Sequence, residues 1–119
     1  MNVKRILLFC VGFFGLIFSI QIFAHAMLES TSPADKSVLK SSPKSLNFNF
    51  GHNTKLVKVK LIGTDLEKSL PVDISSPNSK TFSVPLPTLK PGSYQVNWSS
   101  LSGDGHAVTG IFTFTISGH

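Results

Sequence analysis

Short runs of alternating apolar and polar residues, separated by Pro, Gly, Ser and Asn, constrain this chain more than any other feature. The run from Leu46 to Phe50 alternates strictly, and the run from Leu56 to Ile62 sets aliphatic residues opposite lysines. A period of two is typical of a β-strand that buries one face and exposes the other. From residue 25 onward, no stretch has the period of a long amphipathic helix. The core is therefore expected to come from sheets alone.

Seven such segments follow one another at the spacing of an all-β domain. Turn-forming stretches separate them at intervals of about eight to twelve residues, as in Ser75–Ser79 and Pro87–Gly92. We predict a seven-stranded, antiparallel, immunoglobulin-like Greek-key β-sandwich. Its strands are expected at residues 26–31, 46–50, 56–62, 70–74, 81–86, 93–99 and 111–116. Trp98 is expected in the core, where its indole N–H needs a hydrogen-bond partner.

The first 24 residues have the layout of a secretory signal peptide. Two basic residues precede an apolar run from Ile6 through Ile20, and Ala24 supplies a small residue before the expected cleavage point. Cleavage after Ala24 predicts an exported protein with one small domain over residues 25–119, beginning with His25. Two alternatives stay open, namely cleavage after Ala26, which would remove His25, and an uncleaved signal anchor.

The charged residues and the single cysteine limit which partners the chain can bind and how its fold can be stabilised. Of the 11 Lys and Arg residues, Lys4 and Arg5 leave with the signal peptide, and nine lysines remain against six acidic residues. These lysines are scattered and lack interleaved aromatic residues or Arg, so nucleic-acid binding is not expected. The only cysteine, Cys10, also lies in the signal peptide. The exported domain would therefore have no disulfide and must rely on its apolar core.

The Gly-rich segment Ser102–Gly110 carries the candidate chemistry. Asp104 and His106 stand two residues apart, next to Gly103 and Gly105, which allow backbone angles closed to other residues. A carboxylate and an imidazole aimed at one point can ligate a divalent transition metal. Asp-Gly is also an ordinary turn dipeptide and a loop His is often simply solvated. The pair alone therefore leaves both interpretations open.

His25 would add an unusual donor if it became the first residue. Its α-amine and ring Nδ1 can close one chelate on the same metal, and metal binding displaces the proton of the amine. With Asp104 and His106 this gives the nitrogen and oxygen donors that Cu(II) prefers in a tetragonal set. His52 could lend a further imidazole or be a solvated loop residue. His119, at the chain end, is not expected to be a ligand.

Three segments of the chain carry a family resemblance. They are His25–Asp35, Lys90–Trp98 and Ser102–Phe114. Together they resemble the CopC family of periplasmic copper-binding proteins, in the order in which that family has them. The resemblance implies a seven-stranded sandwich and a Cu(II) site made by the amine and ring of His25 with Asp104 and His106. Some family members also hold Cu(I) in a methionine cluster, but Met27 is the only methionine here after cleavage.

A second departure from the family lies at Phe50–Asn53, where many members carry an acidic residue near the metal. The resemblance implies a Cu(II) carrier or buffer in copper homeostasis or resistance, with the copper ion as cargo and an inner-membrane copper transport protein as partner. We expect a monomer. The alternative is an immunoglobulin-like envelope binding module that contacts proteins through its loops without metal.

An enzyme is not expected. Copper-dependent oxidation of a polysaccharide also uses an N-terminal His with a second His, but the exported chain is too small for an enzyme of that kind. A broad aromatic binding face is also lacking, because Tyr94 and Trp98 are both assigned to the core. No Ser/His/Asp set and no paired carboxylates suggest hydrolysis.

Overall fold

The computed structural model describes residues 28–118. Its strands are β1 (Leu28–Ser32), β2 (Ser37–Leu39), β3 (Ser45–Gly63), β4 (Leu66–Leu70), β5 (Ser79–Pro85), β6 (Gly92–Ser102) and β7 (Ala107–Ile116). The expected signal peptide over residues 1–24 lies outside this part of the chain, as do His25, Met27 and His119. Within residues 28–118, no helix is long and apolar enough to span a membrane.

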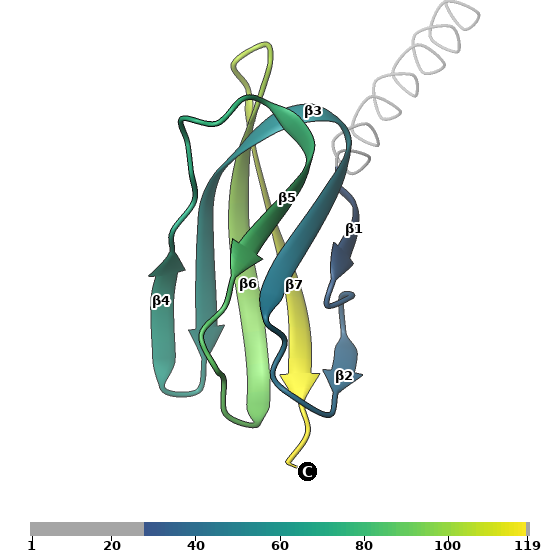
Figure 1. Ribbon diagram of the computed structural model, residues 1–119, viewed down its shortest axis with the longest axis vertical. Coiled ribbons are helices and arrows are strands. Elements are labelled where there is room, and N and C mark those ends of the chain that lie inside the picture. Colours follow the sequence, from purple (N-terminus) through teal and green to yellow (C-terminus); the bar gives the residue numbers. More distant parts are fainter. Residues whose placement is uncertain (1–27, 119) are drawn as a thin grey trace, which may run out of the picture.

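Strand β3 organises the fold because it runs through both layers of the sandwich (Figure 1). Its first part, up to Phe50, pairs antiparallel with β1 and with most of β5. Its second part, from Thr54 to Gly63, pairs antiparallel with β6 and β4. The second layer continues from β6 to β7, and β2 adds to β7 in parallel. One long strand thus connects the two layers covalently.

The core lies between the layers and is made by the inward positions of the alternating pattern. Phe48 and Phe50 in β3 are at most 1% exposed. The rings of Phe48 and Phe112 meet edge to face with centroids 5.7 Å apart, and those of Phe50 and Trp98 at 5.5 Å. Each such pair contributes about 0.5–1.5 kcal/mol beyond the buried area. These contacts join the first part of β3 to β7 and β6 across the sandwich.

Trp98 is buried in this core, with 5% of its surface exposed, as predicted. Its indole N–H was expected to find a partner, and among residues 28–118 it has none. Ser100, which faces inward two residues later, is fully buried with no partner for its hydroxyl in the same part of the chain. The inward face of β6 therefore becomes polar as it approaches the end that carries the β6–β7 hairpin.

The predicted all-β sandwich is confirmed, but several strand limits were wrong. The segments at 46–50 and 56–62 belong to one continuous strand, β3, because residues 51–53 stay extended. The strand predicted at 70–74 was wrong, since β4 ends where that segment was expected to begin. Strand β2 was not predicted at all. It is only three residues long, too short to show a period of two.

The loop that replaces the predicted strand is held by a lysine of β3. Lys55 Nζ donates to the carbonyl oxygens of Ile74 at 2.9 Å and Ser76 at 2.7 Å. Asp73 accepts hydrogen bonds from the backbone N–H and the hydroxyl of Ser75. These side-chain contacts satisfy backbone groups that would otherwise require a strand partner.

Candidate metal centre

The hairpin between β6 and β7 presents Asp104 and His106 at its tip. The two strands pair continuously from Gly92 opposite Ile116 to Leu101 opposite Ala107. The tip is closed by two backbone hydrogen bonds, from Ser102 N–H to the His106 carbonyl at 2.9 Å and from Gly105 N–H to the Ser102 carbonyl at 3.0 Å.

Only one of the two tip glycines uses its conformational freedom. Gly105 has a φ of 90°, which disfavours any residue with a side chain. Gly103 has no positive φ, so the expectation that both glycines supply unusual backbone angles was wrong for Gly103. The direction of the Asp104 and His106 side chains is therefore set by Gly105 and by side-chain hydrogen bonds.

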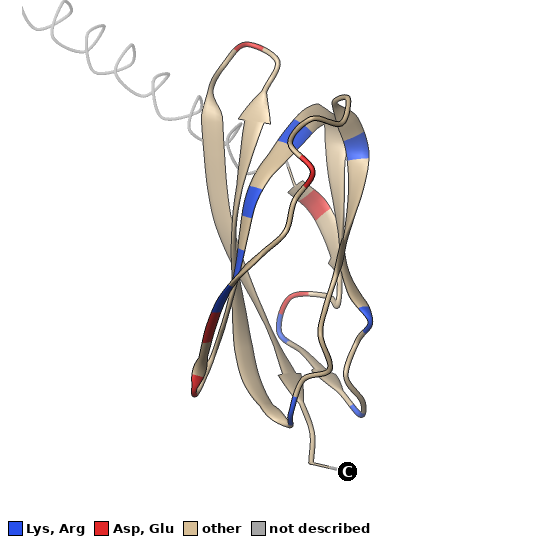
Figure 2. Ribbon diagram, turned by 60° about the vertical axis from the view of Figure 1, so that its left-hand side comes forward, with Lys and Arg blue, Asp and Glu red and all other residues tan. Residues whose placement is uncertain are grey.

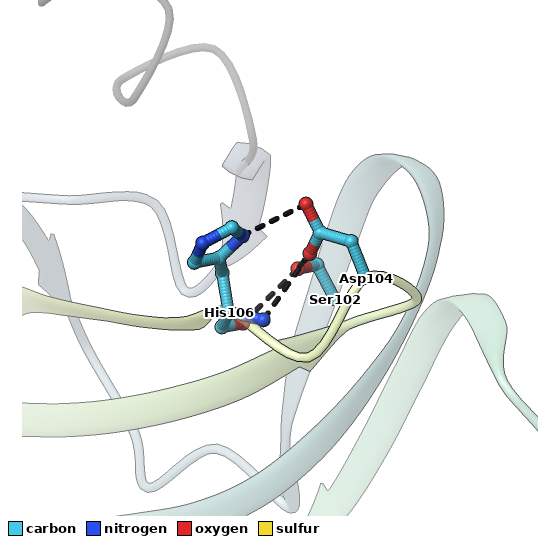
Figure 3. A network of polar contacts seen from close by, with 3 residues as sticks. All are labelled: Ser102, Asp104 and His106. Carbon is cyan, nitrogen blue, oxygen red and sulfur yellow. Dashed lines mark hydrogen bonds and ion pairs between the residues drawn. The ribbon is translucent and has the colours of Figure 1, made fainter.

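The Asp104 carboxylate accepts hydrogen bonds from three groups of its own hairpin (Figure 3). Its Oδ2 lies 2.8 Å from His106 Nδ1, and its Oδ1 accepts the His106 backbone N–H at 3.1 Å. The hydroxyl of Ser102 donates to the same Oδ1. This hydroxyl also lies 3.0 Å from the His106 carbonyl oxygen, and its single proton must be shared between the two acceptors. The structure thus brings Asp104 and His106 into direct contact.

These hydrogen bonds hold the pKa of the Asp104 carboxyl well below its usual range. The Ser102 hydroxyl is the largest cause, followed by the His106 ring and then the His106 backbone N–H. The carboxylate therefore stays ionised throughout the neutral range. The side chains of His106 and Asp104 are 82% and 66% exposed, so an ion in solution can reach both. Exposed pairs of this kind add little to folding stability.

Ser102 is the member of this cluster that the sequence reasoning missed. It stands two residues before Asp104, and short-range hydrogen bonds from Ser to nearby Asx side chains and backbone groups are common in turns. The Ser-x-Asp-x-His spacing was therefore the available signal.

His52 is not brought together with Asp104 and His106. It is exposed, as the solvated interpretation required, but it lies within β3 and not in a loop. Within residues 28–118, no three His, Cys, Asp or Glu side chains gather into a cluster that could hold a metal. A carboxylate does lie beside the neighbouring Gly51, where an added Cβ would be 2.8 Å from Oε1 of Glu29.

The tip of the hairpin and the start of β1 lie at the same end of the sandwich (Figure 1). The strand register gives the reason. Leu28 pairs with Phe50, and Ser102 pairs with Thr54, so that both contacts fall on one short stretch of β3. Figure 2 shows the acidic tip of the hairpin apart from the lysines, which are spread over β3 and other parts of the surface.

Comparison with known families matches residues 28–117 to the CopC domain. The chain belongs to the CopC family. It is 35% identical over 100 residues to Protein YobA of Escherichia coli (strain K12), and the aligned part covers 80% of this chain and 81% of that protein. The CopC crystal structure from Methylosinus trichosporium OB3b has a TM-score of 0.64 and 27% identity, covering 78% of this chain and 94% of that one. PcoC, a methionine-rich copper resistance protein from Escherichia coli, has a TM-score of 0.58 and 26% identity, covering 76% and 97%.

The resemblance to CopC seen in the sequence is therefore confirmed. The part of the chain that matches the CopC domain includes the β6–β7 hairpin with Ser102, Asp104 and His106. His25 precedes the matched part, so its role rests on the sequence argument alone.

Proposed function

We propose that this CopC-family chain is a periplasmic Cu(II)-binding protein that carries or buffers copper and is not an enzyme. Family membership links its function to copper, since its relatives include a copper resistance protein. The observation that carries the proposal is the 2.8 Å contact between the Asp104 carboxylate and the His106 imidazole at an exposed hairpin tip. An oxygen donor that is ionised at neutral pH and an imidazole nitrogen are thereby held side by side.

Asp104 and His106 would hold the ion, and His25 would complete the site. Two donors fall short of the tetragonal set that Cu(II) prefers, so further nitrogen donors are required. The α-amine and ring of His25 supply them if residues 1–24 are removed. Three peptide steps separate His25 from Leu28, a reach of roughly 10 Å when extended. This distance is relevant because β1 begins at the end of the sandwich that carries the hairpin.

Cleavage after Ala24 is an essential part of the proposal because only a free α-amine can close the chelate. The intact mass of the exported protein tests this step directly. We expect a chain that begins at His25. A chain that begins at Met27, or that keeps residues 1–24, would lack this donor and would refute the proposed ligand set.

The exposed position of the site suits a protein that passes its ion on. Because most of the surface of the Asp104 and His106 side chains is open to solvent, an acceptor can approach the ion without unfolding the sandwich. We infer that the acceptor is a copper transport protein of the inner membrane, and that the carrier is a monomer when it delivers copper.

The decisive experiment places one extra residue before His25 in the processed protein. The extension turns the α-amine into a peptide nitrogen and leaves Asp104 and His106 unchanged. A lost chelate costs several kcal/mol of binding free energy, and each 1.4 kcal/mol corresponds to a tenfold change in affinity. The Cu(II) affinity should therefore fall by about two orders of magnitude or more. His106→Ala should weaken binding by no more than the extension does. Thermal unfolding of the metal-free extended form should match that of the processed form.

The exposed residue His52 supplies a matched control, and His52→Ala should leave Cu(II) affinity unchanged. If instead His52→Ala costs as much as His106→Ala while the extension costs nothing, the free terminus is not a ligand. Electron paramagnetic resonance at one equivalent of Cu(II) should show a bound type 2 signal. If no such signal forms, the immunoglobulin-like module without metal becomes the better description.

A further inference from the structure

The bond between Asp104 and Gly105 is the only Asp-Gly bond in the sequence. Aspartate before glycine is open to rearrangement, because the glycine nitrogen has no neighbouring Cβ to hinder its approach to the side-chain carboxyl carbon. The Gly105 nitrogen attacks Cγ of the carboxyl group, and one carboxyl oxygen leaves as water with the N–H proton and one proton from solvent as a five-membered succinimide closes. One water then reopens either carbonyl and gives aspartate or isoaspartate. The mass is unchanged, but isoaspartate carries Cβ in the main chain and a displaced carboxylate.

The other aspartates of the chain differ in the residue that follows. Asp35, Asp65 and Asp73 precede Lys, Leu and Ile, whose side chains shield the attacked nitrogen. Asp104 is also well exposed, with 66% of its side chain open to the water that the second step consumes. Chemistry alone therefore makes Asp104 the aspartate most open to this reaction.

Ser102 contacts both of the reacting groups in the folded hairpin. The carbonyl of Ser102 accepts the N–H of Gly105 at 3.0 Å, which occupies the attacking nitrogen. The hydroxyl of Ser102 donates to Asp104 Oδ1, which also accepts the His106 N–H. These contacts hold the Asp104 carboxylate on the N–H and ring of residue 106 and leave the N–H of residue 105 bonded elsewhere.

We propose that Asp104 is a site of spontaneous isoaspartate formation and that the Ser102 side chain protects it in the folded protein. Ser102 is a positioning residue in this role, because it acts by fixing the carboxylate of its neighbour. These contacts form without a metal ion, so the protection of Asp104 does not depend on copper binding.

The test compares isoaspartate accumulation at Asp104 in metal-free buffer at neutral pH. The folded wild-type domain should form it about tenfold more slowly than a synthetic peptide of residues 99–109, because a hydrogen bond to a charged group is worth about 1.5 kcal/mol and each 1.4 kcal/mol corresponds to tenfold. Ser102→Ala should raise the rate in the folded protein by a similar factor. Ser102→Thr keeps the hydroxyl and should restore the wild-type rate. Ser99→Ala, on the same strand without a carboxylate contact, is the matched control.

Isoaspartate is measured by separating the chymotryptic peptide that spans residues 102–112 and by its resistance to a protease that cleaves before Asp. Trp98 fluorescence verifies that each variant is folded at the incubation temperature. A wild-type domain that isomerises as fast as the peptide would overturn the protection. A folded Ser102→Ala variant that forms isoaspartate no faster than Ser99→Ala would overturn the role of the hydroxyl.

Discussion

Gly110 leaves room for Trp98, and an added methyl group at this position should destabilise the sandwich. The two residues face each other across the β6–β7 ladder. A Cβ on residue 110 would lie 2.6 Å from Trp98 Cε2 and 2.8 Å from Nε1, closer than side-chain contacts allow. The Trp98 ring has no free space to move into, because it is only 5% exposed and Phe50 packs edge to face against it. Gly110→Ala must therefore move a core ring or separate the two strands.

Overpacking of this kind costs about 1–3 kcal/mol, and the fixed ring places Gly110→Ala in the upper half of that range. For a domain of this size each 1 kcal/mol lowers Tm by about 4–8 °C, so we expect a loss of roughly 10 °C or more. Gly103→Ala is the matched control, because nothing lies within 4 Å of its added Cβ and its φ is not positive. Thermal unfolding followed by circular dichroism measures both. If the Gly110→Ala variant has the same Tm as the Gly103→Ala variant, Trp98 does not restrict the space at residue 110.

Three further predictions concern the core, the hairpin and the metal. Phe50→Ala removes a fully buried ring that contacts Phe48, Phe82 and Trp98, and should cost about 3–5 kcal/mol in urea unfolding; a cost below about 1 kcal/mol would contradict this. The lowered pKa of Asp104 means that its hairpin contacts stabilise the folded state above the unfolded pKa and that this contribution disappears as the pH falls toward the folded pKa. An NMR titration of its carboxyl carbon should therefore show ionisation below the usual range, and Ser102→Ala should move the midpoint upward. Cu(I) should bind no more tightly than to a surface His, since one thioether at Met27 cannot build a soft site, and strong Cu(I) retention against a chelator would refute this.

The period-two pattern predicted the sandwich architecture because apolar residues that face the core alternate with polar residues along its strands. Phe48 and Phe50 in the first part of β3, and Val96 and Trp98 in β6, all face the core as their spacing indicated. The polar residues between them stay on the outer faces. Burial of one sheet face is a local property of the sequence, so it can be predicted without knowing which strands pair.

Strand limits were harder to predict because they depend on pairing partners. In β3 the buried positions pass from Leu56 to Val59, three residues apart, so the phase of the alternation changes within the strand. The pairing with β6 shows the cause, since Val57 is an extra residue between Leu56 opposite Ser100 and Lys58 opposite Ser99. Two adjacent apolar residues were the visible sign of this bulge. A simple alternation from 56 to 62 could not include it.

The chemistry of the candidate site was predictable from local spacing, but its position in the fold was not. Asp104 and His106 meet because they stand two residues apart in a tight hairpin. Their place at the end where β1 begins depends instead on the register of β3 with β6. Thr54, which is fully buried, supports this register by donating through Oγ1 to the carbonyl of Leu101 at 3.1 Å. This bond ties the base of the hairpin to the stretch of β3 that lies between its two layers. It joins residues far apart in sequence, and no local pattern can reveal it. A metal ligand supplied from before Leu28 could reach the hairpin only if this non-local register holds the two ends of the site together.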